Sequence, residues 1–311
     1  MLETLLTRRG TPGLAMQGAN DIQGMESSKA RLMNLCATNL PAAGKAWLDE
    51  TLQKVANSNQ LSEDLGLYSA MARRKLGVEY LQQVATLDTR LTTLDISRWS
   101  NAEAGRLILL MTAIETQPEA AQSIISGYYH RGDESERMAL LRGLILFAPA
   151  DYLSELALDA GRSNNLEVLA ALTQDNPYPA FYFNDDQFNQ MVLKALFLGL
   201  AIERIDGLLK RANPELARMA EHYVVEREQA KRPVPVDVWL AIGSCASDTG
   251  RQQMLDYLEH EDIGHRYYCS LALIQCLPED PSLRPVLRQR LDMERETLIL
   301  DLLRDALGTR Q

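Results

Sequence analysis

The chain has 311 residues, of which 46% are apolar and only 6% aromatic, and it carries a formal net charge of -10. This acidic balance argues against nucleic acid as a partner, because phosphate contacts require clustered lysine and arginine. No segment has the roughly eighteen uninterrupted apolar residues that span a bilayer, so we expect no direct membrane insertion. The start of the chain does not resemble a secretory signal, and we therefore expect a cytoplasmic protein.

Residues 10–24 are rich in glycine and carry no periodic apolar pattern. This composition predicts a flexible N-terminal arm over residues 1–25. From Glu26 onward helix signals recur and no run alternates between apolar and polar residues, which predicts one helical domain over residues 26–311 with essentially no sheet. The expected helix starts lie at prolines that suit a first helical residue and at side chains that suit an N-cap: Pro41, Pro118, Pro149, Pro214, Ser62, Ser100, Asp237 and Asp248.

A weak internal repeat links two parts of the chain. Asp133 and Arg137 precede an apolar helix pattern, and Asp262 and Arg266 do the same at identical spacing. Such hairpin patterns are typical of HEAT-type repeats, so the predicted fold class is an all-α, irregular HEAT-like α-α superhelix. Helix capping by the aspartate, with the arginine pairing to it, explains part of the similarity between the two segments without a structural repeat. Any all-helical chain could produce similar echoes, and this alternative stays open.

Residues 174–200 contain four of the five phenylalanines of the chain, which predicts a packed central element. Pro177 and Pro179 each restrict the preceding residue to extended geometry, so we expect a non-helical crossing over residues 176–182. An apolar helix should begin near Asn184 or the residue after it.

Lys194 lies in that apolar helix, where its ammonium must reach water, pair with an acid or meet an anionic ligand. Reaching water is the favoured interpretation. The alternative hypothesis is that the helix and the crossing line a pocket. Trp239, beside two prolines, belongs either to the core, which is favoured, or to the wall of a groove. The candidate ligand- or partner-binding residues are Asn176, Tyr178, Asn184, Asn189, Gln190, Lys194 and Trp239.

The segment from His260 to His265 is similar to the zinc motif HExxH, but its second histidine comes one residue too late. Five helical residues would rotate it by about 140° from the first, so we interpret the segment as a loop and helix cap and predict no metal site. The four cysteines form no ligand cluster, and we expect reduced thiols. No catalytic constellation is recognisable, so we favour a non-enzymatic role without a cofactor, although the sequence leaves catalysis open.

Four segments together resemble the EboA-like proteins: Trp99–Leu110, Asn176–Phe197, Arg218–Arg227 and Pro235–Trp239. The resemblance runs from about Asp95 to Asp248. It implies a bacterial gene cluster that also encodes a prenyltransferase-like membrane protein and sugar-phosphate-type enzymes, and a role in making or moving a secondary-metabolite precursor. It implies no catalytic residue. We therefore expect a scaffold or adaptor that binds protein partners of its pathway. The alternative is a protein or enzyme that binds a small-molecule precursor at residues 176–200.

Overall fold

The computed structural model describes residues 19–81, 86–148 and 150–309, so the predictions for residues 1–18 and for Pro149 lie outside this range. The described chain is helical apart from one short antiparallel hairpin, which confirms the all-α class. The hairpin pairs β1 (Thr86–Asp88) with β2 (Thr93–Asp95), where the sequence predicts no sheet. None of the described helices combines the length and the apolar character that crossing a bilayer requires.

The chain divides into two compact units, residues 1–183 and 184–311. The helices of the first unit are α2 (Ala19–Asn39), α3 (Ala42–Ala56), α4 (Leu61–Leu76), α5 (Asn101–Thr116), α6 (Ala121–Arg131), α7 (Glu134–Arg142), α8 (Asp151–Arg162), α9 (Leu166–Thr173) and α10 (Tyr178–Tyr182). Those of the second are α11 (Asp185–Phe197), α12 (Pro214–Gln229), α13 (Trp239–Ile242), α14 (Asp248–Tyr257), α15 (Ile263–Cys276), α16 (Arg284–Met293) and α17 (Thr297–Leu307). Helix α2 thus begins within the range predicted for the N-terminal arm.

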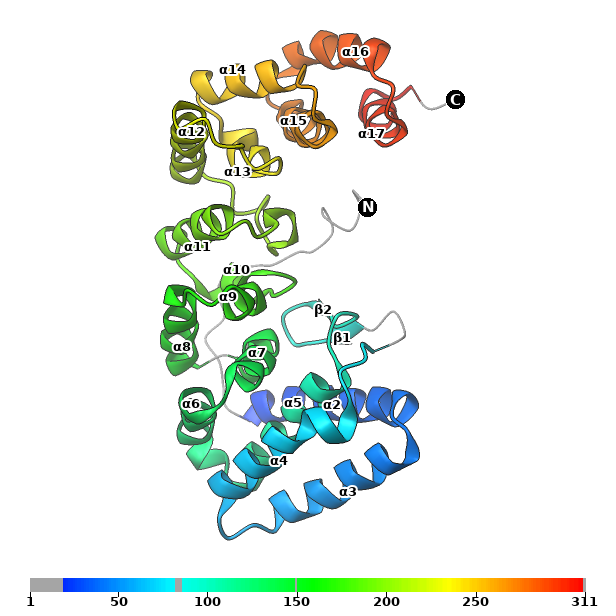
Figure 1. Cartoon of the computed structure of the whole chain (residues 1–311), viewed down its shortest axis with the longest axis vertical. Helices are drawn as coiled ribbons and strands as arrows, with labels where there is room; N and C mark the ends of the chain where they lie inside the picture. The colour runs from blue at the N-terminus through cyan, green and yellow to red at the C-terminus, as the bar shows by residue number, and fades with distance from the viewer. Residues whose placement is uncertain (1–18, 82–85, 149, 310–311) are drawn as a thin grey trace. The chain divides into compact units, whose positions relative to one another are not determined.

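Helix α5 is the central element of the first unit, where it packs against α2, α3, α4 and α7 (Figure 1). Its residues are buried on every side between Asn101 and Ile114, with Glu103 as the one partly exposed position. A helix that is apolar all round has to be enclosed by its neighbours. Arg106 adds polar ties, because its Nε donates to the carbonyl of Ser69 at 3.2 Å and its Nη1 to that of Ser135 at 3.4 Å.

The Phe-rich segment 174–200 is not the central element that its composition predicts. It divides between the two units, and Phe197 at the end of α11 is 69% exposed while Phe188 is fully buried. Helix α11 does begin after Asn184 as expected, and the Asn184 side chain accepts from the backbone N–H of Gln187 at 2.9 Å. The number of phenylalanines did not identify the central element, because α5 contains no aromatic residue. Helix α5 is buried because apolar residues cover all of its faces.

The non-helical crossing predicted over residues 176–182 is wrong, because α10 occupies Tyr178–Tyr182. Pro177 adopts helical backbone angles, φ −76° and ψ −13°, and Pro179 lies in the first turn. The first N–H groups of a helix have no intrahelical acceptor, so prolines there remove no hydrogen bond. The short helix therefore accommodates both prolines.

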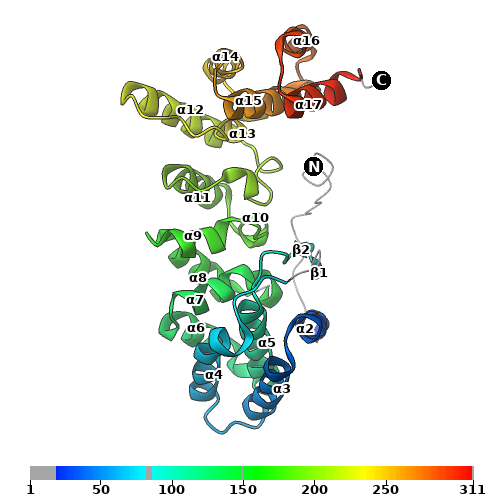
Figure 2. The ribbon, with the colours of Figure 1, turned by 45° about the vertical axis from the view of Figure 1, so that its right-hand side comes forward.

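In the second unit, α14 and α16 form one layer and α15 and α17 form the other (Figure 2). The turn between α14 and α15 is capped as the Asp–Arg pattern predicts, since Asp262 accepts from the backbone N–H of Gly264 at 2.7 Å. In the first unit, Asp133 caps α7 by accepting from the backbone N–H of Glu136 at 2.9 Å. The Asp–Arg pattern that occurs twice in the sequence therefore marks two helix N-termini that are each capped by the aspartate.

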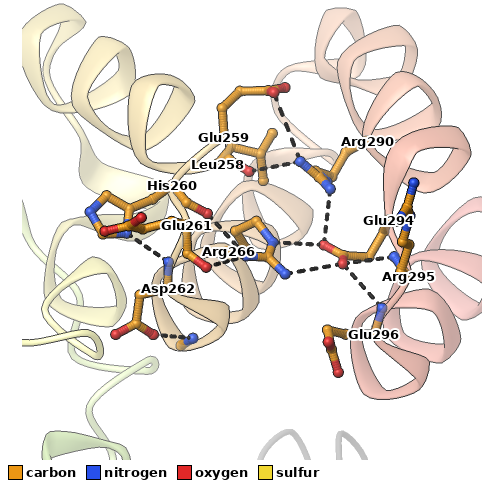
Figure 3. Close-up of polar contacts among 11 residues, drawn as sticks. Leu258, Glu259, His260, Glu261, Asp262, Arg266, Arg290, Glu294, Arg295 and Glu296 are labelled. Carbon is orange, nitrogen blue, oxygen red and sulfur yellow. Dashed lines mark hydrogen bonds and ion pairs between the residues drawn. The ribbon is translucent and has the colours of Figure 1, made fainter.

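The arginine of the pattern, however, does not bind its own aspartate as expected. Arg266 donates to the carbonyl of His260 at 3.0 Å, and Arg137 donates to the carbonyl of Tyr129 at 3.0 Å (Figure 3 shows Arg266). Each arginine thus reaches back to main-chain oxygens at or beyond the end of the preceding helix. Carbonyls at a helix end have no intrahelical donor, and the guanidinium supplies one. The aspartate, in contrast, already accepts a backbone N–H as the helix cap.

Three predicted N-caps are wrong. The N-cap of α4 is Gln60 instead of Ser62, and the N-cap of α14 is Ser247 instead of Asp248. Asp237 is buried and accepts the backbone N–H of Ile202 at 2.7 Å, a partner 35 residues away. Ser100, in contrast, caps α5 as predicted.

Candidate functional site

A pocket of about 310 Å³ opens in the first unit where the ends of α2 and α4 meet the beginnings of α3 and α5. Its walls come from the two helix ends, from the segment that follows α4 and from the first residue of α5. The lining residues are Asn39, Pro41, Lys75, Leu76, Gly77, Glu79, Tyr80 and Asn101.

The segment after α4 is held in place by the start of α5. Gly77 ends the helix with a φ of 84°, a region that favours glycine, and a Cβ there would collide with the carboxylate of Glu79. The backbone N–H of Asn101 donates to the carbonyl of Glu79 at 3.0 Å, and that of Ala102 donates to Gly77 at 3.1 Å. Tyr80 pairs with Ser100 as an isolated bridge. These bonds fix the pocket wall without help from its side chains.

Asn101 carries the most unusual polar group of this pocket. The residue is only 4% exposed, and its Oδ1 atom is buried without a hydrogen-bond partner among the described residues. A buried oxygen without a donor costs about 1–3 kcal/mol, and proteins rarely leave one unpaired.

Two charged side chains of opposite sign line the same pocket. Lys75 and Glu79 are both exposed, whereas Leu76 between them is buried. Tyr80 is 64% exposed, which is unusual for a large aromatic side chain. The lining of the pocket therefore combines an amide residue, a cation, an anion and apolar surface within one small volume.

Of the residues predicted from the sequence, Asn176 and Tyr178 belong to the first unit and are buried. The Asn176 side chain is fully used: its Nδ2 donates to the carbonyls of Leu141 and Ala171, each at 2.9 Å, and its Oδ1 accepts from the N–H of Tyr178 at 3.0 Å. The Tyr178 hydroxyl lies 3.2 Å from the hydroxyl of Ser154. These contacts fix the start of α10.

The other predicted residues lie in the second unit. Asn184 caps α11, and Asn189 exchanges two hydrogen bonds with the amide of Asn213 at 3.0 and 2.9 Å. Gln190 is exposed and Lys194 is partly exposed on the same helix. None of these four lines the pocket described above.

Trp239 is fully buried, in agreement with the favoured core interpretation, and its Nε1–H donates to Nδ1 of His265 at 2.9 Å. The rings of His260 and His265 approach with centroids 4.6 Å apart, although the helical spacing predicts that they diverge. The reason is that His260 precedes α15 and is not on the helix. His260 Nδ1 accepts the N–H of Asp262, so both rings, when neutral, carry their proton on Nε2 and offer no lone pair there to a metal.

The four cysteines are free, as expected. Burial raises the pKa of the Cys36 thiol to about 12 and that of Cys276 to about 11, which keeps both protonated at neutral pH. Among the described residues no group of three or more histidine, cysteine or acidic side chains is arranged to hold a metal ion.

Sequence reasoning missed the pocket because its residues come from four segments between Asn39 and Asn101 that show no shared motif. The sequence shows only that Asn101 follows Ser100 just before an apolar run. An amide at that position has no capping role, because Ser100 already caps the helix.

A family model described as "Metabolite traffic protein EboA" matches residues 28–243 of the chain. The matched span contains every residue that lines the pocket. Helices α14 to α17 lie outside it. No curated protein and no solved structure matches the chain significantly.

Proposed function

The chain belongs to the EboA family, and from this premise we propose that it binds a small metabolite in the pocket at the start of α5 during metabolite traffic. Binding and release are sufficient for such a role, so no reaction has to be catalysed. We place this activity in the cytoplasm.

The unpartnered Oδ1 of Asn101 is the observation that carries the proposal. Structural asparagines in this chain are satisfied, as Asn176 is by three hydrogen bonds and Asn189 by its exchange with Asn213. Asn101 differs from both because its Oδ1 is buried without a partner among the described residues, although the residue lines the pocket. A polar group that lowers the stability of the free protein is typical of a binding site.

The size of the pocket supports a small ligand. Its volume of about 310 Å³ is near the lower end of the range of about 300–1,000 Å³ that small-molecule sites occupy. An extended peptide would need a longer groove with backbone partners. The pocket therefore suits a compact metabolite.

The proposal is tested by screening a metabolite library for compounds that raise the melting temperature of the full chain, followed by calorimetric titration. Asn101→Ala should weaken the binding of a hit about tenfold or more, because a hydrogen bond in a buried site is lost. The variant should fold at least as stably as the wild type, since it removes an unsatisfied oxygen. Asn34→Ala, at an exposed position of α2, is the matched control. Equal affinity of the Asn101→Ala protein, or no hit in the library, would refute the proposal.

A second candidate function is a scaffold or adaptor, in which the helical hairpins form a HEAT-like superhelix that holds protein partners of the same pathway. The exposure of the Phe197 ring, 69% on a helix whose other large apolar side chains are mostly buried, supports it. Exposed aromatic side chains are enriched at protein interfaces. Phe197→Asp should abolish co-purification of a pathway protein and leave metabolite binding intact. Asn101→Ala should weaken metabolite binding and leave co-purification of the pathway protein intact, so the two variants separate the two functions.

A further inference from the structure

Three large apolar side chains are exposed at the ends of helices in the second unit. Ile263 begins α15 and is 47% exposed, Met293 ends α16 and is 51% exposed, and Leu298 lies in the first turn of α17 and is 61% exposed. The other leucine and isoleucine residues of these three helices are buried or half-buried. Contacts inside the unit therefore leave these three side chains uncovered.

The ion pair between Arg266 and Glu294 brings the three helix ends together. Arg266 donates to both carboxylate oxygens of Glu294, which joins the start of α15 to the turn between α16 and α17 (Figure 3). Ile263 lies one helical turn before Arg266, Met293 is adjacent to Glu294, and Leu298 follows that carboxylate by one turn. Single exposed apolar residues are normal on a protein surface, whereas a group of them marks an interaction site.

The charged side chains around this group are mostly acidic. Arg266 and Arg290 both pair with Glu294. Arg290 also lies 3.9 Å from Glu259, so the two arginines are compensated within their own cluster. The other exposed charged residues of the two turns and the adjoining helix ends are Glu261, Asp262, Asp292, Arg295 and Glu296. With four acids and one base, the rim of the apolar group is negative.

The negative rim decides what kind of molecule can cover the apolar group. A second copy that docked with the same face would bring acids against acids. An anionic bilayer surface would be repelled for the same reason. A helix with one apolar stripe bordered by lysine or arginine, in contrast, matches both the apolar side chains and the acidic rim.

We propose that the apolar end surface, formed by Ile263, Met293 and Leu298, binds a basic amphipathic helix of a partner protein. The surface lies outside residues 28–243, which the family model matches, so it adds a partner site to the part of the chain that the family description does not cover. It depends neither on the metabolite pocket nor on the exposed Phe197.

The test uses a fluorescent peptide of about 18 leucine and lysine residues, with the leucines at the spacing of one helix face. Fluorescence anisotropy with the full chain at low salt measures its affinity. The triple variant Ile263→Ser/Met293→Ser/Leu298→Ser should bind about tenfold more weakly or worse, because the apolar contact is lost. Leu166→Ser, at an exposed leucine of α9 in the first unit, is the matched control and should keep the wild-type affinity. Equal affinity of the triple variant and the wild type would overturn the proposal.

Circular dichroism checks that the triple variant is folded. If it is not, Leu298→Ser alone, at the most exposed of the three positions, replaces it and should weaken binding about threefold.

The acidic rim is tested separately. The same peptide with glutamate in place of lysine should not bind. Glu261→Gln/Asp292→Asn should weaken the lysine peptide about threefold and reduce the effect of added salt on its affinity, and Glu167→Gln, at an exposed position of α9, should change neither. Tight binding of the glutamate peptide would overturn the assignment of a basic partner.

Two measurements address the other occupants. If sedimentation velocity shows a wild-type dimer that the triple variant does not form, a second copy covers the surface and the proposal is wrong. If vesicles of phosphatidylcholine and phosphatidylglycerol in equal amounts bind the wild type but not the triple variant, a membrane covers it and the proposal is again wrong. A wild-type monomer that binds the lysine peptide and no vesicles supports the proposal.

Discussion

Arg266 and Glu294 form a two-point ion pair in the second unit, with Nε 3.0 Å from Oε2 and Nη2 3.2 Å from Oε1 (Figure 3). The Glu294 side chain is 1% exposed, and a second guanidinium, that of Arg290, lies 3.2 Å from it. Arg266 also donates to the carbonyls of His260 and Glu261. One carboxylate therefore ties the turn between α14 and α15 to the turn between α16 and α17.

Glu294→Gln should lower the free energy of unfolding by about 3 kcal/mol, because the poorly exposed Arg266 loses its carboxylate partner and Arg290 keeps only the more distant Glu259. Urea denaturation followed by circular dichroism measures this loss. Glu296→Gln, two residues away at an exposed position, should change the stability by less than about 0.5 kcal/mol. Equal stability of the two variants would show that the ion pair does not support the fold.

The same carboxylate predicts a loss of stability in acid. Burial alone would raise the pKa of Glu294, but hydrogen bonds from Arg266 and from the N–H groups of Arg295 and Glu296 lower it from 4.5 to about 2. The folded state thus favours the ionised form, and this stabilisation is complete above pH 4.5 and disappears as the pH falls towards 2. The stability difference between wild type and Glu294→Gln should therefore stay constant above about pH 5 and shrink as the pH falls from 4.5 towards 2. If the stability difference between the two proteins stayed constant down to pH 2, the prediction would be wrong.

Local signals in the sequence predicted local features of the fold. Ser100, Asn184 and Asp262 cap helices as expected, because capping needs only a side chain and the next two or three N–H groups. The prediction that Asp237 is a helix N-cap failed, because its side chain accepts the N–H of Ile202 and no short sequence window contains both residues. The rule that disfavours helix before proline also failed at Pro179, because Tyr178 is the first residue of α10 and tertiary contacts of Asn176 fix its start.

The candidate pocket was beyond sequence reasoning for a similar reason. Its polar groups become related only when the ends of α2 and α4 meet the starts of α3 and α5. A vacant acceptor such as Asn101 Oδ1 cannot be recognised in a sequence, because vacancy is a property of the surrounding packing. Lys194, in contrast, stood out in the sequence because its helix is apolar, yet it lies partly exposed.

Trp239→Phe should raise the pKa of His265. Burial, with a smaller effect of His260, lowers that pKa from 6.5 to about 4, and Asp262 opposes the shift. The Trp239 N–H donates to Nδ1 of His265, an interaction that only the neutral ring can accept. NMR titration of the imidazole should show the pKa moving towards 6.5 in the variant and unchanged in Trp47→Phe. An unchanged value in Trp239→Phe would mean that the hydrogen bond does not favour the neutral ring.

Asn176→Ala should destabilise the chain by about 3 kcal/mol, because three buried main-chain groups lose their partner. Asn184→Ala removes only a helix cap and should cost about 1 kcal/mol. Thermal and urea denaturation measure both losses. Neither change should alter metabolite binding at Asn101. Weakened binding in a folded Asn176→Ala protein would instead favour the pocket first expected at residues 176–200.

Two glycines test how closely α4 and α5 pack beneath the pocket. A Cβ on Gly105 of α5 would collide with Leu76, which lines the pocket, whereas a Cβ on Gly66 of α4 would meet nothing within 4 Å. Gly105→Ala should therefore lower the free energy of unfolding by about 1–3 kcal/mol through overpacking, and it should weaken ligand binding by displacing Leu76. Gly66→Ala should raise the stability by about 0.5–1 kcal/mol, because alanine favours a helix over glycine. Urea denaturation of the two variants gives opposite signs if the contact exists. A stabilising effect of Gly105→Ala would mean that the helices are further apart, and the pocket floor would then lose its support.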